Sequence, residues 1–289
     1  MENSSLRPIL DLEIPGLAVK AWIEVVWHAL ARAREIETQR LNFHKITDQY
    51  HDDWRLLHRF EYNHFYSAWV AVAFRLRACA IHSQDFTDAF QRTSGTSQAI
   101  ELYQEDDALF DFFVKGLAAL ESFYYSLYAL GALIFTPTQT PSVPPSAEFP
   151  LLDPAHLLDP TQPDSMRNIT AAKTHLRFTQ VFPGLPLTEL LGRILGDETY
   201  KEWNQIRNVL AHRAATAGRT IQYQGPLFFQ SGEPPLSVRQ WVSDLPLDAA
   251  TTTSRYDWLR ETINSGLEET SAFANQQLAY TEDQLSRFV

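Results

Sequence analysis

The chain of 289 residues contains a single cysteine, Cys79, so it cannot form an internal disulfide bond. No basic stretch followed by an apolar segment opens the sequence, so the pattern of a secretory leader is missing. Disulfide bonds and leaders are typical of secreted proteins, and we therefore expect a cytoplasmic protein.

Positive charge is also scarce in this sequence. Lysine and arginine total 24 against 35 aspartate and glutamate, which gives a formal net charge of −11. This balance excludes a general polyanion binder of the basic-patch kind, because phosphate backbones attract positive charge. Any nucleic-acid site would have to be local.

Several motifs that carry nucleotide or nucleophile chemistry are missing. Neither a Walker motif nor Gly-x-Gly-x-x-Gly, the loops that cradle phosphates, occurs in the chain. A Gly-x-Ser-x-Gly elbow is absent, and Cys79 has no base beside it in the sequence. These absences disfavour a nucleotide-hydrolysing or dinucleotide-dependent enzyme, and we expect no cofactor.

Helical periodicity dominates what is present. Apolar residues recur at spacings of three and four, which is typical of amphipathic helices packed in a bundle. The pattern predicts helices over residues 17–46, 52–82, 105–135, 166–181, 187–195, 198–214 and 253–285. Residues 83–97 are polar and are expected to form a loop, and Gly266 is expected to weaken the last helix. The expected fold is an all-α multi-helix bundle, one domain over residues 1–289.

The segment from Leu117 to Phe135 is about as long and apolar as a short membrane-spanning helix. However, Glu121, two serines and three tyrosines interrupt it, and no basic flank precedes it. We therefore expect a buried helix of the bundle and no membrane partner.

Two regions depart from the helical pattern. Eight of the 16 prolines lie between residues 136 and 165, and they predict a long insertion or loop because proline interrupts helices and central strands. Between residues 219 and 245 the apolar period changes to two around a Ser-Gly-Glu-Pro turn. That change predicts a small β-hairpin between the last two helices.

The histidines suggest a metal site only weakly. Glu61 and His64 have the Glu-x-x-His spacing of di-iron bundles, and further histidines stand at 44, 51 and 58. A di-iron site needs a second such motif, and the sequence contains none. Histidines on a polar helix face are the better interpretation, and we expect no metal.

One predicted helix carries an arginine among apolar residues. At roughly 100° per residue, Arg207 shares a helix face with Trp203 and Leu210. An unpaired buried charge costs several kcal/mol, so Arg207 is expected to have an acidic partner or an anionic ligand. Glu121, the acid of the most apolar helix, and a phosphate group are the two candidates.

The segment Arg207-Asn208-Val209-Leu210-Ala211-His212 resembles the motif of the HEPN superfamily (higher eukaryote and prokaryote nucleotide-binding domains). That motif is an arginine, often followed by a polar residue such as asparagine, then a short gap and a histidine late on a bundle helix. In catalytic members of the family, two motifs meet across a dimer and cleave RNA without a metal, with the 2′-hydroxyl as nucleophile.

The resemblance implies a role for each residue. Arg207 would stabilise the charge that develops on the phosphate, His212 would act as general base or acid, and Asn208 would orient the phosphate or the histidine. Arg213 would add local positive charge, with Glu121 supporting Arg207. The implied protein is a homodimeric, metal-independent ribonuclease of toxin or defence type with RNA or a nucleotide as ligand and a protein inhibitor as a possible partner. The alternative is a non-catalytic bundle that binds a nucleotide or a protein.

Geometry sets a condition on these roles. Five residues of regular helix turn about 500°, which leaves Arg207 and His212 roughly 140° apart. The helix must therefore end or distort near Ala211, or the arginine must reach round it, or the pair must form across a dimer. In the non-catalytic interpretation, an Arg207–Glu121 pair fixes helix register and His212 lies at a helix C-terminus, where positive charge is favoured.

Overall fold

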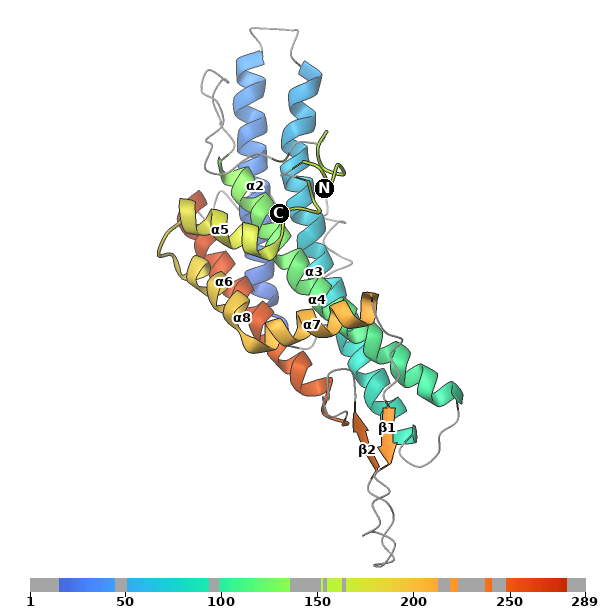
Figure 1. Ribbon diagram of the computed structural model, residues 1–289. Coiled ribbons are helices and arrows are strands. Elements are labelled where there is room, and N and C mark those ends of the chain that lie inside the picture. Colours follow the sequence, from blue (N-terminus) through green and yellow to red (C-terminus); the bar gives the residue numbers. More distant parts are fainter. Residues whose placement is uncertain are drawn as a thin grey trace, which may run out of the picture. The chain divides into compact units, whose positions relative to one another are not determined.

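The computed structural model describes residues 16–44, 51–93, 99–135, 152, 155–162, 165–212, 219–222, 237–240 and 248–279. Most of these residues are helical, so the all-α class is confirmed (Figure 1). The described helices are α2 (Val19–His44), α3 (His51–Thr93), α4 (Ala99–Phe135), α5 (Ala171–Val181), α6 (Pro186–Gly196), α7 (Glu198–His212) and α8 (Thr253–Leu278).

The chain divides into two compact units. Unit 1 comprises Met1–Phe74, Ala119–Gly196 and Glu261–Val289, and unit 2 comprises Arg75–Ala118 and Asp197–Arg260. Helices α3, α4 and α8 each contribute residues to both units. Neither unit is a continuous stretch of sequence, although the sequence pattern predicts one domain.

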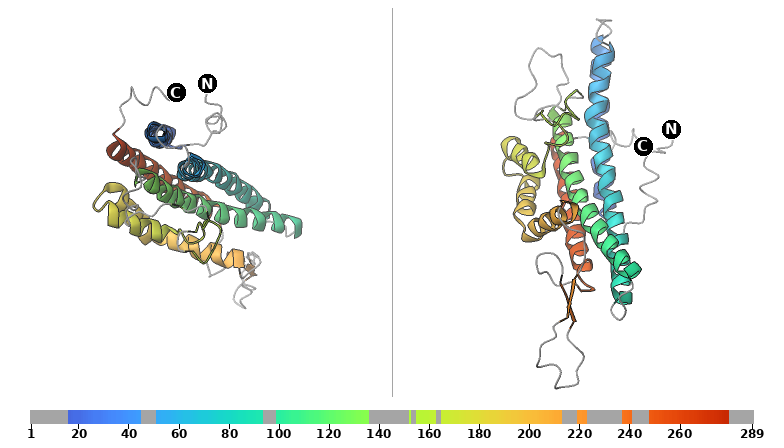
Figure 2. Two further views of the ribbon diagram at one scale, coloured as in Figure 1. Left: turned by 90° about the horizontal axis from the view of Figure 1, so that it is seen from above. Right: turned by 45° about the vertical axis from the view of Figure 1, so that its right-hand side comes forward.

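In unit 1, two buried tryptophans join α2 to the first part of α3, and these segments lie side by side (Figure 2). The Trp22 indole N–H donates to the Trp69 carbonyl at 3.4 Å, and the Trp69 indole donates back to the Trp22 carbonyl at 3.1 Å. The two rings stack with centroids 6.4 Å apart. Buried indole N–H groups need acceptors, and here each helix supplies the acceptor for the other.

The second half of α4 is the centre of the remaining core of unit 1. The Tyr124 hydroxyl donates to the Leu191 carbonyl of α6 at 2.8 Å, and the Thr174 hydroxyl of α5 donates to the Tyr124 carbonyl at 3.3 Å. On α8, Gly266 faces the Phe123 ring so closely that a Cβ atom there would lie 2.5 Å from Cζ. The glycine is therefore a close-packing position for α4 as well as a weak helix former.

In unit 2, the end of α3 packs antiparallel against the start of α4. Arg75 Nη1 donates to the Ala118 carbonyl at 2.9 Å, and the Cys79 thiol lies 3.6 Å from the Phe112 carbonyl. The residue numbers of these partners fall along one helix as they rise along the other, as antiparallel packing requires.

The expected loop over residues 83–97 is wrong for its first eleven residues, because α3 continues to Thr93. Phe86 and Ala89 are buried on its inner face, spaced three apart. Most of the polar residues of this segment face outward, although Ser83 is buried, and burial of one apolar stripe is enough to hold a helix in a fold.

The helix expected from residue 166 begins later, at Ala171. Residues 165–170 form turns, in which the amide of Asn168 donates to the Ser165 carbonyl at 2.9 Å. Thr170 has extended backbone angles and its side chain accepts from the Lys173 amide, so it is the N-cap.

A short antiparallel strand pair lies in the region where the sequence predicts a hairpin. It consists of β1 (Arg219–Gln222) and β2 (Ser237–Gln240), with Ile221 opposite Val238. Residues 223–236, which connect the strands, lie outside the described residues, as does most of the predicted proline-rich insertion at 136–165.

One segment within the described residues, Tyr103–Phe135 of α4, is long and apolar enough to cross a membrane. In its most apolar window, 83% of the residues are buried inside the protein. This burial agrees with the expectation of a core helix.

Candidate functional site

The residues of the predicted motif lie at the end of α7, in unit 2. The helix follows Asp197, whose carboxylate accepts from the Thr199 amide at 2.7 Å, and Glu198 stands in its first turn. Acidic groups at this end satisfy free amide donors and favour the positive end of the helix dipole. The start of α7 is therefore set by local sequence.

Trp203 holds α7 in unit 2. Its buried indole N–H donates to the Phe113 carbonyl at 3.2 Å, and its ring stacks on Phe112 with centroids 5.4 Å apart. Close approach to α4 is possible because Gly116 has no side chain, since a Cβ there would lie 2.3 Å from Trp203 Cζ2. The apolar face of α7 therefore packs against α4 as the spacing of its residues predicts.

Arg207 lies at the edge of this buried face. It is half-buried, whereas Trp203, Ile206 and Leu210 are buried and Asn208 is exposed. The place of Arg207 on the inner face agrees with the sequence, although the residue is less buried than its apolar neighbours. Arginine can lay its aliphatic stem along apolar neighbours while its charged head stays near solvent, so full desolvation of the charge is not required.

His212 is the last residue of α7. Residues 213–218 lie outside the described residues, so the first geometric condition, that the helix ends near Ala211, stays a prediction. The His212 side chain and all of Arg213 lie outside the described residues. Their roles stay predictions.

Glu121, the predicted supporting acid, is exposed on α4. It belongs to unit 1, whereas Arg207 belongs to unit 2. The ion pair between them stays a prediction.

Among the described residues, Cys79 and His64 have structural surroundings. Burial of Cys79 raises the pKa of its thiol well above the usual value, which keeps it protonated and a poor nucleophile. His64 Nδ1 hydrogen-bonds the Tyr125 hydroxyl at 2.9 Å, and burial lowers the pKa of this histidine. Within the described ranges, no three His, Cys, Asp or Glu side chains are grouped as metal ligands. The side chains of His44, His51 and His58 are outside those ranges.

The motif end of α7 therefore carries a half-buried arginine and an exposed asparagine on a firmly packed helix. Both groups donate hydrogen bonds, and the guanidinium fork matches the oxygens of a phosphate. No family model, curated protein or solved structure matches this chain.

Proposed function

We propose that this protein is a HEPN-like, metal-independent endoribonuclease of toxin or defence type that acts as a homodimer. The observation that carries the proposal is the half-buried Arg207 followed by the exposed Asn208, one turn before the end of α7. A fully buried arginine could not meet RNA, and the partial exposure of Arg207 beside the exposed Asn208 supports the proposal that the two residues bind a phosphate.

The chemistry follows from the three motif residues. His212 would take the proton of a ribose 2′-hydroxyl, whose oxygen attacks the adjacent phosphorus while the bond from phosphorus to the 5′-oxygen breaks. Arg207 would pair with the non-bridging oxygens, which gain charge in the transition state, and Asn208 would orient the same phosphate. The proton then passes to the leaving 5′-oxygen, and the products are a 2′,3′-cyclic phosphate and a 5′-hydroxyl.

A dimer is proposed because Arg207 and His212 lie on different sides of the same helix. A regular helix leaves Arg207 and His212 roughly 140° apart, so two copies of α7 would complete one site more easily than a single copy. In an acidic chain with net charge −11, the site would depend on local arginines, and Arg213 supplies a second one.

The first experiment is RNA cleavage in EDTA by the wild type and by Arg207→Ala, Asn208→Ala and His212→Ala. Loss of His212 is expected to slow cleavage by about 10²- to 10⁴-fold, the usual contribution of a general acid or base. Arg193→Ala, at an exposed position on α6, serves as the control for loss of one positive charge. A substrate with deoxyribose at the cleaved nucleotide should resist the wild type.

Three outcomes would remove the nuclease proposal: no cleavage by the wild type, equal cleavage by all variants, or cleavage of the deoxyribose substrate. RNA or nucleotide binding without cleavage would favour the non-catalytic alternative. The dimer is tested by mixing inactive Arg207→Ala and His212→Ala proteins. Partial recovery is expected if one copy supplies the arginine and the other the histidine, and no recovery means that each copy is complete by itself.

A further inference from the structure

A second surface of unit 2, formed by the end of α3 and the start of α4, is independent of the α7 motif. The residues of α3 on this surface are spaced by three and four, which places them on one face of the helix. They are Ile81, Asp85, Asp88 and Arg92, and all four are exposed.

The residues of α4 on this surface follow the pattern i, i+3, i+4 and i+7, which also lies on one face of a helix. They are Ile100, Tyr103, Gln104 and Asp107, and all four are also exposed. Two polar faces with apolar residues among them therefore border one another where α3 and α4 pack.

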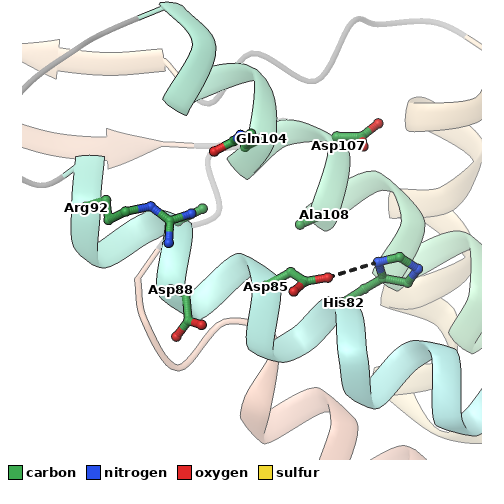
Figure 3. A pocket seen from close by; sticks show the side chains of 8 residues that line it. His82, Asp85, Asp88, Arg92, Gln104, Asp107 and Ala108 are labelled. Carbon is green, nitrogen blue, oxygen red and sulfur yellow. Dashed lines mark ion pairs between the residues drawn. The ribbon is translucent and has the colours of Figure 1, made fainter.

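A pocket of about 320 Å³ lies between these two faces (Figure 3). Its small lining residues Ala89 and Ala108 are buried, so the hollow exists because short side chains meet where α3 and α4 touch. Arg92 and Gln104 lie at one end of the pocket and His82 at the other. We name it the α3–α4 pocket.

The α3–α4 pocket is predominantly acidic. Asp85, Asp88 and Asp107 line it against the single guanidinium of Arg92. At the far end, His82 lies 3.7 Å from Asp85 and 3.6 Å from Asp111, so a fourth carboxylate stands just beyond the lining. This field would attract a cation and repel a phosphate.

Exposed apolar side chains lie one helical turn before residues that line the pocket: Ile81 before Asp85, Ile100 before Gln104 and Tyr103 before Asp107. Ile81, Ile100 and Tyr103 are 49%, 59% and 63% exposed, whereas Phe86 and Phe112 of the same two helices are buried. An exposed aromatic beside an exposed aliphatic is typical of the centre of protein interfaces, where tyrosine is enriched. These exposed side chains therefore favour an occupant that is apolar as well as cationic.

We propose that the α3–α4 pocket binds a basic amphipathic segment of a protein partner. A lysine or arginine side chain of that segment enters the pocket between Asp85, Asp88 and Asp107, and its apolar residues cover Ile100 and Tyr103. A small inorganic cation would leave these apolar side chains uncovered, and RNA would bring phosphates against carboxylates. The proposal does not depend on the ribonuclease activity.

The test uses the full chain and a random peptide library displayed on phage. Peptides are selected on the wild type, and the enriched sequences are synthesised and measured by fluorescence anisotropy. The pocket variant is Asp85→Asn/Asp88→Asn/Asp107→Asn. Its matched control is Glu189→Gln/Glu261→Gln/Glu268→Gln, which removes three exposed acids elsewhere and changes the net charge equally.

We expect the enriched peptides to combine lysine or arginine with apolar residues. Their Kd should rise by about tenfold or more on the pocket variant, as for the loss of charge-assisted hydrogen bonds worth about 1.4 kcal/mol in total, and should stay unchanged on the control. Ile100→Ser/Tyr103→Ser should also weaken binding. Leu158→Ser/Leu176→Ser, which replaces two exposed leucines of unit 1, should not.

Several results would overturn the proposal. Equal weakening by the pocket variant and its charge control would show diffuse attraction to an acidic protein. Enrichment of acidic peptides, or of none that respond to the pocket variant, would show that the pocket is not a cationic site. If the wild type self-associates and Ile100→Ser/Tyr103→Ser makes it monomeric, the occupant is a second copy of this chain. Far-UV circular dichroism confirms that each variant is folded.

Discussion

At the scale of single residues, the position of the candidate site depends on how Trp203 fits beside α4. The indole is almost fully buried, its N–H is satisfied by the Phe113 carbonyl, and its ring fills the space beside Gly116. Buried aromatic side chains are large contributors to core stability, and their fit tolerates little added volume. Arg207 lies one turn after Trp203 on α7, so a shift of the tryptophan against α4 would also displace the motif.

Replacement of Gly116 by alanine tests this fit. The new Cβ would meet the Trp203 ring at 2.3 Å, so either the ring or α4 must move. We expect a loss of about 1–3 kcal/mol in the free energy of unfolding, the usual cost of overpacking, measured by urea denaturation. Gly196→Ala is the control, because no atom lies within 4 Å of a Cβ at that position. Equal stability of Gly116→Ala and the wild type would mean that the tryptophan is loosely held.

His28 should make the stability of the protein depend on pH. The residue is buried, its Nε2–H donates to Asn275 Oδ1 at 2.7 Å, and burial lowers its pKa below 6.5. Above pH 6.5 both folded and unfolded states are neutral at this position. As the pH falls through 6.5, the unfolded state binds the proton first, so stability decreases by at most about 1.4 kcal/mol per pH unit from this histidine.

The measurement is urea denaturation at pH 7.5 and pH 5.5. We expect His28→Gln, which keeps a hydrogen-bond donor toward Asn275, to lose less stability on acidification than the wild type. His64 has a pKa lowered in the same direction, so part of the pH dependence should remain in His28→Gln. An unchanged pH dependence in that variant would contradict the assignment.

At the scale of helices, the sequence was informative wherever an apolar stripe was continuous. The stripes of α2, α4 and α8 are long, and each was predicted to within a few residues at most ends. The last eleven residues of α3 are not predicted as helix, because residues 83–93 are mostly polar and only the spacing of Phe86 and Ala89 indicates a buried face. The sequence does not predict the α3–α4 pocket either, since two of its acids, Asp85 and Asp88, lie in the expected loop.

The candidate site was predictable only in part, for a similar reason. Periodicity placed Arg207 on the face of Trp203 and Leu210, and the structure agrees that this face is the inner one. How deeply each residue is buried depends on the neighbouring helix, and periodicity carries no information about that helix. The sequence therefore does not predict the exposure of Asn208 and Glu121 or the close approach of Gly266 to the Phe123 ring, because both depend on how the helices pack.

The start of α5 gives a prediction at this scale. Thr170 accepts a hydrogen bond from the Lys173 amide, which would otherwise be unsatisfied at the helix end. Thr170→Ala should therefore lower the free energy of unfolding by about 1 kcal/mol, whereas Thr170→Ser should keep most of it. Thermal denaturation of both variants provides the comparison. If the alanine and serine variants have equal stability, the helix does not depend on this cap.

At the scale of the whole molecule, the two compact units share three helices. Unit 1 is assembled from three separate stretches of sequence and unit 2 from two, and α3, α4 and α8 each run from one unit into the other. Unfolding of one unit alone would require each of these helices to end abruptly in its interior. Helix formation is cooperative, so creating such new ends is unfavourable.

We therefore expect one cooperative unfolding transition for the whole chain. Phe178→Leu alters the core of unit 1 and Phe112→Leu that of unit 2, and both phenylalanines are fully buried. Each substitution should destabilise the protein by about 1 kcal/mol and shift the same single midpoint. Tryptophan fluorescence and far-UV circular dichroism should report coincident urea curves for all three proteins, as two-state unfolding requires. If Phe112→Leu instead moved only one part of a biphasic curve while Phe178→Leu moved the other, the units would unfold independently despite their shared helices.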